Sequence, residues 1–176
     1  MLASPSFFTV MDSYPIELIF PIREGRSEAQ VGKKGKDKGR WRIGIKRCWL
    51  LNAEAKVGAW DWNTLNTPDQ TFNPLAQNLS GQTIVLTDLG FRDQDGIPDH
   101  LKRCPKGTWN EPMRVETALS RVTTICHLKK ISHRLSDYIQ ARLAFIGIMF
   151  KVLLDLFHQL HPDAEPFQMS IAEFSL

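Results

Sequence analysis

The chain has 176 residues, 43% of them hydrophobic, which is enough to bury the core of one ordinary domain. Its formal net charge is only +3, yet residues 23–47 hold ten lysines and arginines against three acids. The three cysteines stand apart without a CxxC pair, which argues against a disulfide framework or a thiolate metal site and fits a reduced, cytoplasmic setting. The concentrated positive charge indicates a polyanion as partner.

Neither the first residues nor the longest apolar run suggests a membrane protein. The first fifteen residues lack the charged and apolar regions of a signal peptide. The longest unbroken apolar run, Leu143 to Phe150, has eight residues, which is too short for a membrane span and suits a buried helix. We therefore expect one domain over residues 1–161 and a loose tail over residues 162–176.

The first elements predict a strand, a loop and a hairpin. The run SFFTVMD, residues 6–12, is apolar and β-prone and ends at Asp12, where SYP indicates a turn. Residues 23–40 are rich in charge and glycine and predict a solvated basic loop. Residues 40–52 alternate between apolar and basic side chains and then become wholly apolar, and residues 57–64 return after a short turn. Two strands joined so tightly form an antiparallel hairpin.

A helix and a buried strand follow the hairpin. Thr67 as cap, Pro68 at the first helical position and Asp69 in the first turn predict a short helix. The run TIVLT before Asp88 is continuously apolar or β-branched, as in a strand that is buried on both faces. A helix between two strands makes the later strand parallel to the first by the crossover rule. The pattern therefore predicts an α/β fold with a mixed sheet, an antiparallel hairpin and parallel strands flanked by helices.

The second half of the chain is predicted to be mostly helical. Residues 100–105 could form a short further strand. Residues 108–131 begin with capping residues and repeat apolar side chains at helical spacing, and residues 136–161 form a second long helix that packs against the sheet.

Acidic side chains mark a candidate metal site. Asp12 and Asp88 each follow a predicted strand, and the carboxyl ends of adjacent parallel strands place active groups together. In the next helix Glu111 has the capping-box spacing from Thr108, whereas Glu116 sits at the edge of the apolar stripe, where a charge needs a partner. Converging carboxylates repel one another unless a cation lies between them, and hard oxygen ligands select Mg²⁺ or Mn²⁺. Two such ions can stabilise both the attacking oxygen and the leaving oxygen when a phosphodiester bond is displaced.

Each of these residues also has a purely structural interpretation. Asp12 could be a turn residue, and Glu116 could point at water. Asp61 could be a ligand, but strand alternation would place it on a solvated face opposite Trp60 and Trp62. The basic segment could be only a solvated loop, or it could neutralise phosphates outside the site.

The ordered set of phrases resembles the ribonuclease H-like catalytic domain of bacterial insertion-sequence transposases of the DDE type. The similarity covers roughly residues 8–157 and lies in DSYPIELIFPIREGR, GKKGKDKGRWRIGIK, AWDWNTLNTPDQTFNPL, IVLTDLGF and GTWNEPMRVETALSRV. The resemblance implies that Asp12, Asp88 and Glu116 are catalytic and hold Mg²⁺ or Mn²⁺, with two ions expected. It also implies cleavage of DNA at an element's ends and attack of the freed 3′-hydroxyl on target DNA.

The resemblance carries expectations about partners as well. The partners would be double-stranded DNA, at element ends and target, and a second copy in a homodimer, with no membrane and a nucleoid-associated location in the cytoplasm. The expected DNA contacts are Lys33, Lys34, Lys36, Lys38, Arg40, Arg114, Lys129 and Lys130. Family members usually carry a substantial region before the first Asp, and eleven residues precede Asp12 here, which suggests an N-terminally truncated copy. The alternatives are a simple nuclease of the same fold and a DNA-binding remnant with idle acids.

Overall fold

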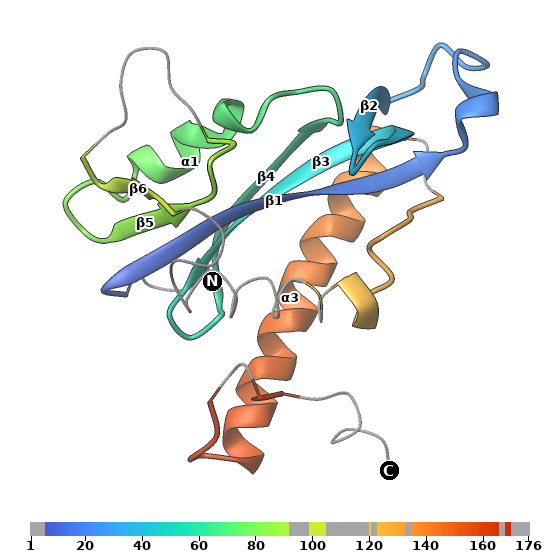
Figure 1. Ribbon diagram of the computed structural model, residues 1–176. Helices are drawn as coiled ribbons and strands as arrows, with labels where there is room; N and C mark the ends of the chain where they lie inside the picture. Colours follow the sequence, from blue (N-terminus) through green and yellow to red (C-terminus); the bar gives the residue numbers. More distant parts are fainter. Residues whose placement is uncertain are drawn as a thin grey trace.

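A computed structural model describes residues 6–91, 99–104, 120, 123–132, 135–165, 168 and 169. Within them one six-stranded mixed sheet is combined with helices, which confirms the predicted α/β class (Figure 1). The strands are β1 (Phe8–Ile19), β2 (Lys33–Asp37), β3 (Arg40–Asn52), β4 (Val57–Thr64), β5 (Ile84–Thr87) and β6 (Leu101–Arg103).

The strand order is β2-β3-β1-β5-β6, and β4 pairs with β3 on the same edge as β2. β3 is antiparallel to β1, β2 and β4, whereas β5 runs parallel to β1 and β6 parallel to β5. This combination of an antiparallel hairpin with parallel strands is consistent with the ribonuclease H-like layout expected from the sequence. The short strand predicted near residue 101 is confirmed as β6.

The β3–β4 hairpin has the predicted bounds, and its turn has a clear local cause. The side-chain oxygen of Asn52 accepts hydrogen bonds from the backbone N–H groups of Glu54 and Lys56, at 3.0 and 2.9 Å. Ala55 between them adopts a positive φ of 60°. Asparagine side chains close turns in this way by replacing a backbone acceptor.

The first strand is longer than predicted, because SYP does not end it. β1 continues through Pro15 to Ile19 and pairs with β3 over almost its whole length. The backbone nitrogen of Glu17 bonds to Lys129 on the side away from β3, and strand alternation puts the Pro15 nitrogen on that same side. Pro15 therefore costs the β1–β3 ladder no hydrogen bond.

The basic loop predicted over residues 23–40 is corrected in part, because β2 lies inside it. β2 pairs with β3 through a two-residue turn at Lys38 and Gly39, whose φ values of 44° and 82° suit the primed turns of hairpins. Lysine and glycine have low strand propensity, so residues 33–37 carry little sequence signal for a strand. Exposed lysines are nevertheless common on an edge strand, where they discourage pairing with other chains.

Among the described residues the helices are η1 (Pro21–Arg23), η2 (Asp69–Phe72), α1 (Asn73–Gln77) and α3 (Ser136–Leu160). The short 3₁₀ turn η1 was not predicted. The helix predicted after Thr67 is a 3₁₀ turn followed by a short α-helix, and α3 confirms the long helix predicted over 136–161. The helix predicted over 108–131 lies largely outside the described residues. The tail is tied down at one point, because Met169 is buried in the main core.

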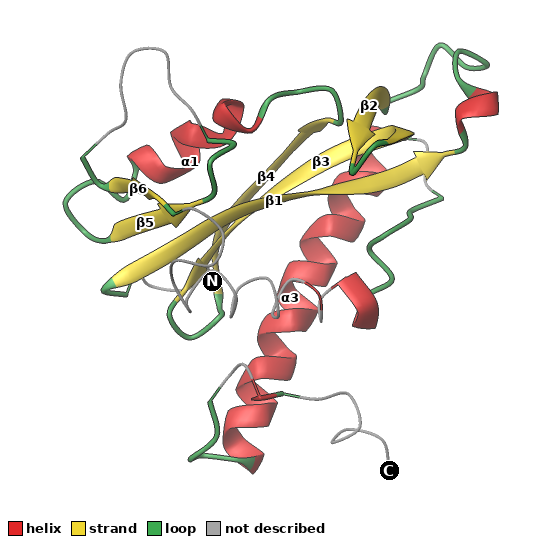
Figure 2. Ribbon diagram, viewed as in Figure 1, coloured by secondary structure: helices red, strands yellow, loops and turns green. Residues whose placement is uncertain are grey.

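The sheet buries a core on each face (Figure 2). The larger core packs α3 onto side chains such as Ile16, Ile45 and Trp49. The smaller core packs Phe72 and Ala76 onto the other face. Because side chains alternate along a strand, each residue of β1 and β3 can be assigned to the α3 face or to the α1 face.

Arg47 joins α3 to the sheet. Its side chain is fully buried between Trp49 and Trp60, with the guanidinium carbon 3.6 and 4.4 Å from the two ring centroids. Nη1 donates a hydrogen bond of 2.8 Å to the carbonyl oxygen of Leu143 in α3. Burial lowers the pKa of Arg47 to about 10, because the charged form loses water.

The opposite side of α3 is apolar and exposed. Among the described helices α3 is the one whose length and composition would allow it to cross a membrane, with a mean hydropathy of 1.7 over its most apolar window. The length of the apolar run Leu143 to Phe150 therefore understates how long and apolar the whole helix is. Core helices of soluble proteins pass the same test, and the inner side of α3 is buried from Ile139 to Phe157.

Two glycines give opposite predictions for stability. A Cβ at Gly147 would meet Arg47 and Trp49 at 3.7 Å, an ordinary contact, and alanine is favoured over glycine inside a helix. We expect Gly147→Ala to raise the free energy of unfolding by about 0.5–1 kcal/mol. A Cβ at Gly44 would overlap the carbonyl oxygen of Ile16, so Gly44→Ala should destabilise strongly. Urea denaturation of both variants checks this, and a destabilised Gly147→Ala would contradict the close packing of α3 on Arg47.

Candidate functional site

Asp12 and Asp88 lie next to each other along neighbouring strands. The parallel register of β1 and β5 runs from Phe8–Ile84 to Met11–Thr87, and the two acids are the residues that follow the last pair. Asp88 comes directly after β5, as predicted. Asp12, in contrast, lies inside β1, because that strand continues to Ile19. Asp12 and Asp88 are therefore adjacent along the backbone, as predicted. The reason differs, because only β5 ends there and β1 continues beside it.

The side chain of Asp12 starts on the α3 face. Asp12 is opposite Trp49 across the antiparallel pair, and Trp49 belongs to the core beneath α3. Directly opposite residues share a face of the sheet. One carboxylate oxygen of Asp12 accepts a 2.8 Å hydrogen bond from the backbone N–H of Ser13, and the side chain is half-buried.

Asp88 meets a carboxylate that the sequence did not single out as a ligand. Its Oδ1 accepts a hydrogen bond of 2.9 Å from the backbone N–H of Gly90. A Cβ placed on Gly90 would lie 3.0 Å from Asp88 Oδ1 and 2.7 Å from Asp69 Oδ2. The oxygens of Asp88 and Asp69 therefore converge on one point, and glycine leaves that point open.

Asp69 is held in place from two other strands. Its Oδ1 accepts a hydrogen bond of 2.5 Å from the hydroxyl of Ser13 in β1 and lies 2.9 Å from Lys46 Nζ in β3. Lys46 also donates to the carbonyl oxygen of Thr67, at 2.8 Å. From the sequence, Asp69 was interpreted as an acid in the first turn of a helix that begins at Pro68. Its place over β1 and β3 follows only from the long-range packing of η2.

Acidic side chains make this part of the sheet electronegative. Burial raises the pKa of the Cys48 thiol well above its usual value, and the carboxylates of Asp12, Asp69 and Asp61 raise it further against Lys46. Cys48 therefore stays protonated and is not a nucleophile. Asp61 itself is exposed on β4, between Trp60 and Trp62, which pack toward the α3 face, as the strand alternation predicted.

The donors present suit a hard divalent cation, but they do not by themselves complete a site. Among the described residues no set of three or more His, Cys, Asp or Glu side chains is arranged to hold a metal ion. The converging oxygens of Asp69 and Asp88 fit Mg²⁺ or Mn²⁺, which take carboxylate ligands. Glu116 and Arg114, the third predicted ligand and a predicted DNA contact, lie outside the described residues.

The predicted DNA contacts divide into paired and unpaired groups. Lys34 lies 3.8 Å from Glu24, and Lys130 lies 3.7 Å from Glu17. The others are exposed and have no acidic partner within the described part of the chain: Lys33, Lys36, Lys38, Arg40 and Lys129. This second group is better placed to contact phosphates, because its charge is not already neutralised.

Metal affinity tests the convergence of Asp69 and Asp88. We expect calorimetric titration to show Mn²⁺ binding to the wild type and at least tenfold weaker binding to Asp88→Asn and Asp69→Asn, since each loses a charged oxygen ligand. Asp61→Asn is the matched control, because Asp61 is exposed and, within the described residues, its Oδ1 accepts a hydrogen bond only from Trp62 N–H. Equal affinity in all four proteins would contradict a metal site at this point.

Comparison of the chain with protein-family models, with curated proteins and with solved structures finds no match. What bears on function is therefore the strand order, the backbone adjacency of Asp12 and Asp88, and the convergence of Asp69 and Asp88.

Proposed function

We propose that the chain is a DDE transposase domain that carries out divalent-metal-dependent cleavage and strand transfer of insertion-sequence DNA. The single observation that carries the proposal is the position of Asp12 and Asp88 at the end of the β1–β5 parallel pair, within a ribonuclease H-like strand order. Ligands and catalytic groups of open α/β sheets gather at such strand ends.

The carboxylates supply the chemistry at this position. Asp88 and Asp12 are the proposed metal ligands, with Glu116 as the third, and Asp69 adds an oxygen beside Asp88. Bound Mg²⁺ or Mn²⁺, as one or two ions, would stabilise the charge that develops on the phosphate oxygens. Ser13 and Lys46 hold Asp69 in a fixed orientation, so its second oxygen stays directed at the shared point.

The basic residues supply affinity for the substrate. Lys33, Lys36, Lys38 and Arg40 lie on the β2–β3 hairpin, which extends from the level of Glu17 to beyond the Ile19 end of β1. Duplex DNA carries one negative charge per about 1.7 Å, so a strip of exposed cations binds it without regard to sequence. Such a partner fits a protein that works on the bacterial nucleoid.

A simple nuclease of the same fold is the nearest alternative, since the same acids would cut DNA without joining it. A strand-transfer assay separates the two activities. A DNA-binding remnant is the alternative from another class, because it uses the exposed lysines alone. It predicts salt-sensitive DNA binding without metal-dependent cleavage.

Loss of Asp88 tests the enzymatic proposal. We expect the wild type to nick element-end DNA in Mn²⁺ and Asp88→Asn to lose this activity by about 10²–10³-fold, the usual cost of removing a group that stabilises developing charge. Asp61→Asn should keep wild-type activity. If Asp88→Asn nicks DNA as fast as the wild type, the proposed catalytic role of Asp88 is wrong.

A second copy of the chain is the proposed partner for the outer side of α3. Six large apolar side chains, each between 41% and 70% exposed, recur there at spacings of three and four residues: Phe145, Ile148, Met149, Val152, Leu156 and Leu160. They extend over about 22 Å of helix, at 1.5 Å per residue. A stable interface buries about 800 Å² per partner around an apolar centre, which a stripe of this length can provide.

Sedimentation velocity checks the pairing. We expect the wild type to sediment as a dimer and Val152→Asp as a monomer, because a charge at the centre of the stripe would be buried without a partner. Gln140→Asp is the control, since Gln140 is exposed on the same helix and lies outside the stripe. A monomeric wild type at micromolar concentration would contradict the dimer.

A further inference from the structure

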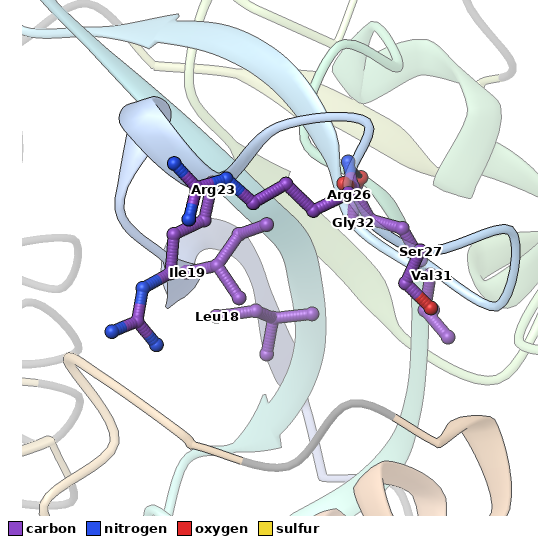
Figure 3. Close-up of a pocket in the computed structure, with 8 residues that line it drawn as sticks. Leu18, Ile19, Arg23, Arg26, Ser27, Val31 and Gly32 are labelled. Atoms are coloured by element: carbon purple, nitrogen blue, oxygen red, sulfur yellow. Dashed lines mark hydrogen bonds between the residues drawn. The ribbon is translucent and has the colours of Figure 1, made fainter.

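A small pocket lies in the connection between β1 and β2, away from the carboxylates (Figure 3). Its volume is about 170 Å³. The floor is apolar, formed by Leu18, Ile19 and Val31. The remaining lining residues are polar or glycine: Arg23, Arg26, Ser27, Gln30 and Gly32.

The backbone around the pocket is held by local hydrogen bonds. The side-chain amide of Gln30 accepts from the N–H of Gly25 at 2.9 Å and donates to the carbonyl oxygen of Gly32 at 2.8 Å, so it spans the connection. Gly25 has a φ of 72°, which a residue with a side chain rarely adopts. Gly32 lies against the backbone of Gly44 in β3. The pocket is therefore shaped before any ligand arrives.

The polar lining consists mainly of unneutralised donors. Arg23 and Arg26 make no ion pair with an acid in the described part of the chain, and Glu24 between them pairs with Lys34 instead. Figure 3 shows the side chains of Arg23 and Arg26 on the Ile19 side of the view, with their guanidinium groups apart from each other. An anion in the pocket would be attracted by both positive charges, because neither is neutralised by an acid of the described residues. Guanidinium groups recognise phosphate by paired hydrogen bonds.

We propose that this pocket binds a phosphodiester group of a DNA strand, with the sugar resting on the apolar floor. The proposal rests on the function proposed above and adds a second point of contact for the same DNA. Seven residues of β1 separate Asp12 from Ile19, which corresponds to about 23 Å at 3.3 Å per residue. One turn of duplex is about 34 Å, so one DNA molecule lying along β1 can reach both the carboxylates and the pocket.

The exposed cations of the β2–β3 hairpin belong to the same end of the sheet. β2 pairs Lys33 with Gly44, and Gly44 in turn pairs with Glu17 near the end of β1. A strand bound in the pocket would therefore continue over the hairpin. Arg23 and Arg26 position the backbone at one fixed point, whereas the lysines supply charge without fixed geometry.

Binding measured in EDTA tests the pocket apart from cleavage. The probe is a labelled 20-base-pair duplex followed by fluorescence anisotropy at several salt concentrations. We expect Arg23→Ala/Arg26→Ala to bind at least tenfold more weakly, and its slope of log affinity against log salt to be shallower by about 1.8, because two phosphate contacts are lost. Lys56→Ala/Lys151→Ala removes the same charge near the β3–β4 turn and in α3, and it should leave both values unchanged.

A conservative variant and a small probe test the shape of the site. Arg23→Lys/Arg26→Lys should keep the salt slope and lose affinity, because the charge remains while the paired hydrogen bonds do not. A 5′-phosphorylated thymidine dinucleotide should shift the amide NMR signals of Gly25, Ser27 and Gly32 at lower concentration than inorganic phosphate does. Equal response to the two probes would mean a small-anion site and would overturn the proposal.

The outcomes separate the two proposals. If the wild type binds DNA and the double alanine variant binds it with the same slope, the pocket is not a phosphate site, although the proposed function survives. If the wild type does not bind DNA at all, both are wrong. If binding depends on Arg23 and Arg26 while Asp88→Asn leaves nicking unchanged, the pocket survives and the catalytic assignment fails.

Discussion

The structure depends on one buried cation. Arg47 lies between two tryptophan rings and reaches the main chain of α3, so it links the central antiparallel strands to the longest helix. Its Nε and Nη2 have no hydrogen-bond partner among the described residues, which makes the burial costly. The arrangement is stable only because the rings face the guanidinium and the Leu143 carbonyl accepts from it. A single helix position satisfies these contacts together, so Arg47 fixes how α3 lies on the sheet.

α3 covers one face of the sheet, and the proposed chemistry lies at the end of β5. On the α3 face the alternating side chains of β1 are used for the core, apart from Asp12. On the other face, the short α1 and η2 cover less of the strands, and polar groups from three elements meet there: Ser13, Lys46 and Asp69. β5 is only four residues long, which exposes Asp88 beside the longer β1. The unequal strand lengths create the site.

The sequence predicted those parts whose cause is local. The hairpin follows from alternation and from Asn52 at its turn, β5 from a continuous apolar run, and α3 from its length and composition. The extension of β1 through Pro15 was not predicted. A proline removes a ladder hydrogen bond only where its nitrogen faces the paired strand, and the sequence alone does not show which side that is. β2 was missed because its lysines are explained only by its place at a sheet edge. Asp69 was assigned to a helix start, which is correct locally but does not reveal its contact with β1.

The charges along β1 are segregated by sign, and in the proposed function this makes only the contact of DNA with the carboxylates depend on a metal ion. Carboxylates gather around Cys48 near the middle of the strand, and lysines and arginines without an acidic partner among the described residues gather toward its Ile19 end. A polyanion is attracted to the basic end and repelled by the acidic end. These two ends are about 23 Å apart, which exceeds the electrostatic screening length of about 8 Å. The two ends therefore act almost independently in physiological salt. Under the proposed function DNA would bind at the basic end without a metal ion, and its phosphates would approach the carboxylates closely only when a divalent cation had reversed the local charge.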